Sequence, residues 1–140
     1  MAETLKTWWL PNGVVVEISD ESVQSSADSW TIKLAVKGVI EVKREYLSDL
    51  DEKPDYLEIL SMLLPTARYQ REILKPGVAQ KDVPAEKAAL LSIFEKNALF
   101  YFEREDFPER YVRKLYKELE KELARNTYVK EQIKKKSQNR

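Results

Sequence analysis

Five basic side chains recur every three or four residues near the C-terminal end of the chain, and the chemistry they share is anion binding. They are Arg110, Lys114, Lys117, Lys121 and Arg125. At about 100° per residue they fall along one side of a helix, and we call them the basic ridge. Such a ridge can neutralise the phosphates of a nucleic acid and bind them in a salt-dependent way. The alternative is a solvated helix face whose flanking glutamates cancel most of its field.

Two adjacent tryptophans, Trp8 and Trp9, precede the turn sequence LPNG. A type I turn with the proline second and Gly13 in the left-handed conformation predicts a hairpin with a bulge, in which Trp8 lies opposite Val16. Neighbouring strand residues point to opposite faces, so we expect Trp8 in the core and Trp9 on the other face with Val15. Trp9 and Val15 are a candidate contact for another protein or a second copy, since tryptophan is enriched at interface hot spots. The alternative is that another segment of the same chain packs there.

Catalytic and metal chemistry finds little support in the residue types. The chain has no histidine and no cysteine, which removes the commonest transition-metal ligands, a histidine general base and a thiol nucleophile. The acidic residues are dispersed. Arg68, Arg71 and Glu72 could line a pocket, but their spacing does not show that they converge. We therefore name no catalytic, cofactor-binding or metal-binding residue, expect no cofactor or metal, and favour a non-catalytic role.

Composition bounds the class of protein. The 140 residues carry 24 Lys and Arg against 24 Asp and Glu, so there is no overall bias towards nucleic acid or an anionic membrane. The sequence contains neither a leader pattern nor an apolar run of membrane-spanning length, so we expect a cytoplasmic protein that does not bind membranes. We expect one α+β domain over residues 1–126 and a basic, frayed tail over residues 127–140.

The first third of the chain has the period of β-strands. After the hairpin and a polar loop over residues 20–28, apolar residues alternate strictly with others over residues 30–43, which predicts a long strand with one buried face. Gly38 within it predicts a bulge or bend. Residues 66–74 alternate except at Arg71, and we expect a fourth strand there, ended by the sequence KPG.

The helices expected to position these residues follow. Residues 56–64 predict a short helix ended by Pro65. A long central helix is expected from Pro84 to about Glu105, with apolar residues on so broad an arc that it should pack on more than one side. The sequence DFPE predicts a new helix capped by Asp106 that continues to about Arg125.

The segments TWWLPNGVVVEI and EDFPERYVRKLYKELEKEL resemble a family of small uncharacterised bacterial proteins. That family pairs a W-x-LPNG hairpin with an FP-x-R-[FY]-V helix. The resemblance covers most of the chain and implies a single domain and a bacterial, cytosolic origin. The family has no assigned activity, so the resemblance implies no catalytic or binding residue.

Together these patterns predict an α+β fold in which a three- or four-stranded antiparallel meander packs against the long central helix, with the C-terminal helix beside it. The function we favour is that of a non-catalytic protein-binding or adaptor module. The alternative is a nucleic-acid-associated protein that uses the basic ridge and the C-terminal lysines.

Overall fold

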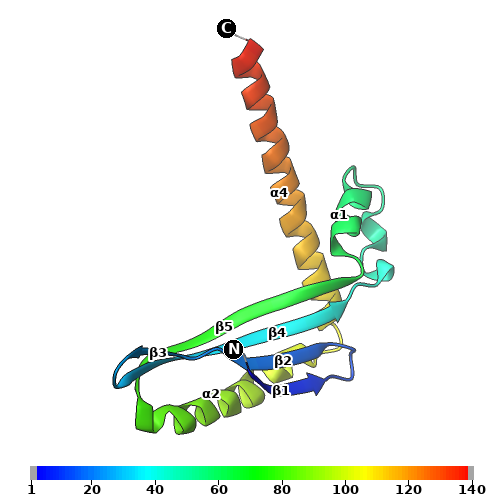
Figure 1. Cartoon of the computed structure of the whole chain (residues 1–140). Helices are drawn as coiled ribbons and strands as arrows, with labels where there is room; N and C mark the ends of the chain where they lie inside the picture. Colours follow the sequence, from blue (N-terminus) through cyan, green and yellow to red (C-terminus); the bar gives the residue numbers. More distant parts are fainter. Residues whose placement is uncertain (1–2, 139–140) are drawn as a thin grey trace. The chain divides into compact units, whose positions relative to one another are not determined.

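A computed structural model describes residues 3–138 and divides the chain into two compact units (Figure 1). The first, here the sheet unit, runs up to Glu41 and again from Thr66 to Pro108. The second, here the helix unit, spans Val42–Pro65 and continues from Glu109. The predicted α+β class with an antiparallel sheet is confirmed. The prediction of one domain over residues 1–126 stays a prediction.

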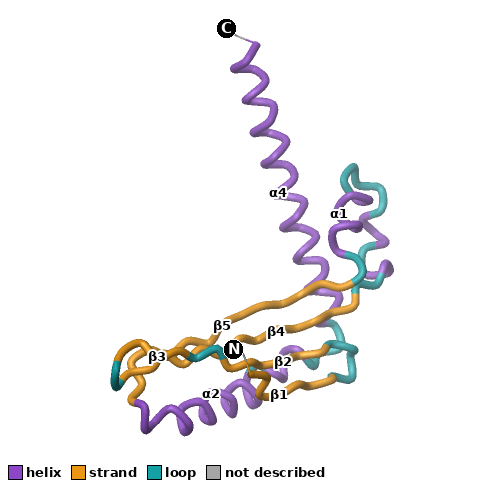
Figure 2. The backbone as a smooth tube through the Cα atoms, viewed as in Figure 1, coloured by secondary structure: helices purple, strands orange, loops and turns teal. Residues whose placement is uncertain are grey.

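The sheet unit is built on five antiparallel strands, one more than the most that we expected (Figure 2). They are β1 (Glu3–Trp9), β2 (Val15–Asp20), β3 (Val23–Ser26), β4 (Ser29–Glu41) and β5 (Thr66–Ala79). Strand β4 is central: β2 and β3 follow each other along one of its edges, and β5 pairs along the other. The predicted alternation of β4 is confirmed, because Ile32, Leu34 and Val36 are buried while Lys37 and Val39 are exposed.

The first hairpin closes as the sequence predicts. Leu10 N donates to Val14 O at 2.9 Å, and Gly13 N donates to Leu10 O at 3.0 Å. Gly13 has a φ of 88°, a conformation that suits glycine. Trp8 therefore pairs with Val16. Trp8 is half-buried, and its ring lies 5.5 Å from that of Phe94.

The polar loop expected over residues 20–28 is wrong, and so is the bulge that was one of the two alternatives expected at Gly38. The segment expected to be a polar loop, residues 20–28, contains β3, whose four residues are all exposed and so have no apolar period. Gly38 makes no bulge: it pairs in register with Val16 and Tyr69, and a Cβ there would lie 3.3 Å from Tyr69 Cβ. Glycine thus allows two backbones to approach closely.

Strand β5 is confirmed over residues 66–74 and continues to Ala79. The sequence KPG, expected to end it, instead forms a bulge, since the register shifts between the pairs Lys75–Ile32 and Val78–Trp30. Gly77 has a φ of 69°, which lets the extra residues leave the ladder.

The expected central helix is two helices, α2 (Val83–Asn97) and α3 (Leu99–Phe102), interrupted at Ala98. Helix α2 lies along one face of the sheet (Figure 1), and its buried Phe94 packs against Phe102 of α3 with ring centroids 6.2 Å apart. The broad apolar arc is not buried all round, because Ile93 is 55% exposed and Phe100 is 70% exposed. The expectation of packing on more than one side is therefore wrong.

Asn12 joins the first hairpin to the segment after α3. Its Nδ2 donates to Phe102 O at 2.7 Å and to Arg104 O at 2.8 Å, while its Oδ1 accepts from Val14 N at 3.1 Å. The amide thus satisfies carbonyls at the end of a helix, where the backbone itself offers no partner. The turn and the segment just before the FP sequence are therefore held together by one side chain.

The helix unit contains α1 (Tyr56–Leu63), two short 3₁₀ turns (Arg44–Tyr46 and Ser48–Leu50) and most of α4 (Phe107–Gln138). A further 3₁₀ turn, Gln80–Asp82, leads into α2 in the sheet unit. The predicted helices at residues 56 and 107 are confirmed, but α4 does not end near Arg125. The expected frayed tail is wrong for residues 127–138, which are helical, and residues 139–140 lie outside the described part. Val112 and Tyr116 of α4 are fully buried.

Candidate functional site

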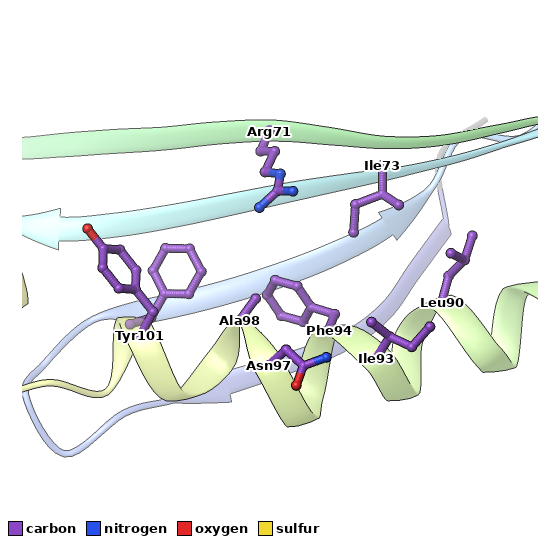
Figure 3. A pocket seen from close by; sticks show the side chains of 9 residues that line it. Arg71, Ile73, Leu90, Ile93, Phe94, Asn97, Ala98 and Tyr101 are labelled. Atoms are coloured by element: carbon purple, nitrogen blue, oxygen red, sulfur yellow. The ribbon is translucent and has the colours of Figure 1, made fainter.

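A groove with a largely apolar lining lies between β5 and α2 in the sheet unit (Figure 3) and has a volume of about 410 Å³. Its lining comes from β5, α2 and α3, and it includes Arg71, Ile73, Leu90, Ile93, Phe94 and Tyr101. Alternation along β5 positions the first two: Arg71 pairs with Val36 and Ile73 with Leu34, so both stand on the face that α2 covers. Figure 3 shows both side chains pointing from the strand towards the helix.

The floor and rim of the groove differ in exposure. Phe94 and Phe102 are buried at its floor, while Ile93 and Tyr101 at its rim are 55% and 54% exposed. Asn97 adds the only side-chain amide among the lining residues. The groove can therefore hold an apolar group, with a guanidinium and an amide available to a polar one.

The strand above this groove has a free edge. Strand β5 pairs with β4 along one side, and in the part of the chain that the structure describes no strand pairs with its other side. Between Thr66 and Leu74 its register is unbroken. A free edge presents backbone N–H and C=O groups that another strand can bind.

The predicted contact residues Trp9 and Val15 are neighbours across β1 and β2, and Val39 extends the row onto β4. Trp9 is 76% exposed and Val39 is 41% exposed, while Val15 is half-buried. The row lies on the face opposite to the one that carries Trp8. Ala35, which pairs with Ser19 further along β4, is only 6% exposed.

The structure brings the predicted basic ridge together on one side of α4 in the helix unit. All five of its side chains are exposed. Four of them, Arg110, Lys114, Lys117 and Lys121, surround a shallow hollow of about 510 Å³ together with Arg113 and Glu118. Glu118 lies 4.0 Å from Lys114 and offsets part of the charge.

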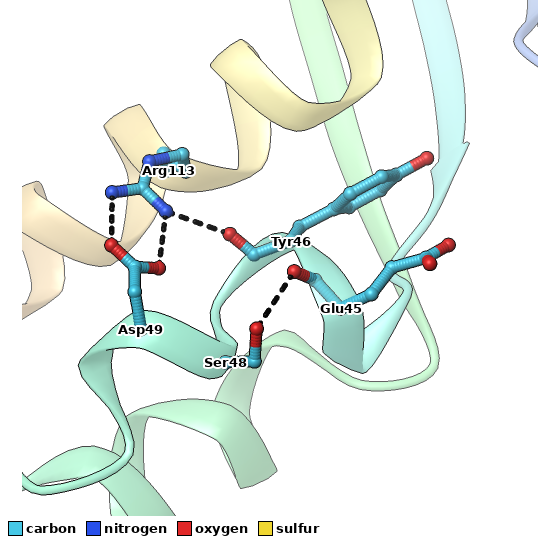
Figure 4. A network of polar contacts seen from close by, with 5 residues as sticks. All are labelled: Glu45, Tyr46, Ser48, Asp49 and Arg113. Atoms are coloured by element: carbon cyan, nitrogen blue, oxygen red, sulfur yellow. Dashed lines mark hydrogen bonds and ion pairs between the residues drawn. The ribbon is translucent and has the colours of Figure 1, made fainter.

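Arg113, which the ridge pattern omits, serves the structure of the helix unit (Figure 4). Its guanidinium donates to both carboxylate oxygens of Asp49, at 2.7 and 2.9 Å, and to Tyr46 O at 2.9 Å. These hydrogen bonds lower the pKa of Asp49 and raise that of Arg113. Arg113 therefore holds the turn before α1 against α4.

Sequence reasoning named Arg71 but did not place it in a groove. Arg68 and Glu72, named with it, have the opposite parity on β5, and Glu72 instead lies 3.2 Å from Lys33. The available signal was the break in alternation at Arg71, where a charged residue occupies a position on the buried face. The groove also depends on α2, which no pattern within residues 66–74 could supply.

Among residues 3–138, no group of three or more acidic side chains is placed to hold a metal ion. No helix in that part of the chain is long and apolar enough to cross a membrane.

A scan against protein-family models found no match to this chain, and searches of curated proteins and of solved structures found none. Its resemblance to the family of small bacterial proteins therefore stays a prediction, and any function must be inferred from the surfaces above.

Proposed function

We propose that this chain is a small, cytoplasmic, non-catalytic module that binds an extended segment of a partner protein along the free edge of β5. The observation that carries this proposal is the position of the apolar groove directly beside that edge (Figure 3). The absence of cysteine is consistent with a reducing compartment.

Strand addition uses the two parts of the site for different purposes. Backbone hydrogen bonds to β5 would supply sequence-independent affinity, and pockets for alternate side chains would supply selectivity. In an added strand every second side chain points to the face of α2. An apolar side chain at such a position would enter the groove and cover Ile93 and Tyr101.

The other sheet edge is less suited to a partner. Strand β1 carries a register shift between Thr4 and Lys6, and a bulge twists an edge away from further pairing. Strand β3 is only four residues long. Of the three strands that have an unpaired side within residues 3–138, β5 offers the longest regular edge.

Selection of random nine-residue peptides displayed on phage, against the purified full chain, tests the proposal. We expect enriched peptides with alternating β-branched or aromatic residues. Ile93→Asp should weaken their binding at least about tenfold, because a buried charge in an apolar contact is costly. Phe100→Asp is the matched control: Phe100 is 70% exposed nearby but does not line the groove, so binding should be unchanged.

Backbone methylation of a selected peptide tests the strand geometry itself. Alternate N–H groups of a strand point to the same edge, so N-methylation at one set of alternate positions should abolish binding and methylation at the other set should not. Equal tolerance of both sets, or no enrichment of any peptide, would refute strand addition at this site.

A second candidate function is nucleic-acid binding by the basic ridge. What supports it is the exposure of all five cations and the shallow hollow around which four of them gather. The five would act with the exposed lysines towards the end of α4, through phosphates and without base-specific contacts.

A further inference from the structure

We infer that the partner segment carries a carboxylate that pairs with Arg71, next to the apolar side chain that fills the groove. This inference rests on the proposed function, and it adds the chemistry of the partner to the location of the site. The carboxylate can be that of an aspartate or glutamate, or that of a free C-terminus, because both present the same two oxygens.

Arg71 stands out among the cations between α2 and the strands. Three lysines there each pair with a carboxylate across the helix–sheet junction. The pairs are Lys6 with Glu95, Lys75 with Glu86 and Lys87 with Asp20. Among the described residues, no carboxylate pairs with Arg71 and no hydrogen bond is made by its guanidinium. Its charge is thus left for a group from outside.

The residues around Arg71 explain why its charge is uncompensated. It shares the groove with Phe94 and Asn97 of α2, with Ala98 between the two helices and with the aromatic residues of α3, none of which is acidic. Further along the same face of β5, Lys75 meets Glu86 from the helix. The residues of α2 that face β5 are therefore acidic beside Lys75, whereas beside Arg71 they are apolar or carry an amide.

The guanidinium is suited to a carboxylate more than to other acceptors. Its planar set of N–H donors binds both oxygens of a carboxylate at once, and such charge-assisted hydrogen bonds are about twice as strong as neutral ones. Arg71 is exposed, so its guanidinium is accessible to a carboxylate of a docked segment. A nearby Asn97 amide can donate to the same group.

The test uses the peptides selected against the full chain. We expect an acidic residue, or the free C-terminal carboxylate, to be enriched at a fixed spacing from the apolar residue. In fluorescence anisotropy, replacing that Glu by Gln, or amidating that C-terminus, should weaken binding about tenfold. The two replacements distinguish the two sources of carboxylate.

Arg71→Gln should remove this preference, so that the Glu and Gln peptides bind equally well. Arg68→Gln is the matched control, since Arg68 lies on the same strand with the opposite parity, and the preference should survive. Peptides that bind without an acid preference, or a preference that persists in Arg71→Gln, would overturn this inference and leave the proposed function standing. Failure to select any peptide would refute the proposed function itself.

Discussion

Replacing each of the two adjacent tryptophans by alanine should have unequal effects on stability. Trp8 is half-buried against Phe94. Replacing a buried tryptophan by alanine costs about 3–5 kcal/mol of stability. Because Trp8 is partly exposed, we expect Trp8→Ala to cost about 3 kcal/mol. Trp9 is 76% exposed. About a quarter of the roughly 250 Å² surface of the Trp9 side chain is therefore buried. At about 25 cal/mol per Å², Trp9→Ala should lower the free energy of unfolding by at most about 1.5 kcal/mol.

Urea denaturation followed by far-ultraviolet circular dichroism measures both losses without relying on tryptophan fluorescence. The expected order is a lower midpoint for Trp8→Ala than for Trp9→Ala, with similar slopes. Trp9→Phe serves as a control for strand preference, because it keeps an aromatic ring on the same face. Equal losses, or a larger loss for Trp9→Ala, would contradict the register of the first hairpin and the placement of Trp9 on the outer face.

Two further predictions concern charge. Burial raises the pKa of Asp20, but hydrogen bonds from Lys87 and from Ser22 outweigh it, and the net pKa lies below the ordinary 3.8. The Asp20 carboxylate therefore adds stability above that pH, which is lost as pH falls through the lowered pKa. Asp20→Asn should cost about 1 kcal/mol at pH 7 and almost nothing near pH 2, as measured by urea denaturation, and a loss that is independent of pH would refute the pairing. If the basic ridge binds nucleic acid, affinity for random duplex DNA measured by fluorescence anisotropy should fall with salt, the five ridge cations contributing about −4.5 to the slope of log affinity against log salt, and Lys117→Ala with Lys121→Ala should flatten that slope by about 2. No binding at low salt would refute nucleic-acid binding by the basic ridge.

The sequence predicts those elements whose signals are local. The proline and glycine of the first turn determine its type, and the alternation over residues 30–43 determines which face of β4 is buried. The four exposed residues of β3 carry no such signal, and they form a strand because β4 extends far enough to pair with them. The interruption between α2 and α3 at Ala98 also has no signal in the sequence, since alanine is a good helix former.

The candidate sites also differ in whether a local sequence pattern predicts them. The basic ridge follows from the period of one helix, and the row of Trp9 and Val15 follows from the register of one hairpin. The groove requires Arg71 of β5 and Ile93 of α2 to meet across a pairing and a helix–sheet contact. Only the register of β5 on β4, with α2 laid against the same face, brings them together.

The bulge at Pro76 and Gly77 sets the length of regular edge that β5 would offer to a docked segment. A docked segment finds a regular edge from Thr66 to Leu74 and then meets a proline, which has no N–H to offer, and a kink. The bulge would thereby limit the length of a docked segment, and it would also limit the length over which a second copy of the chain could pair with this strand.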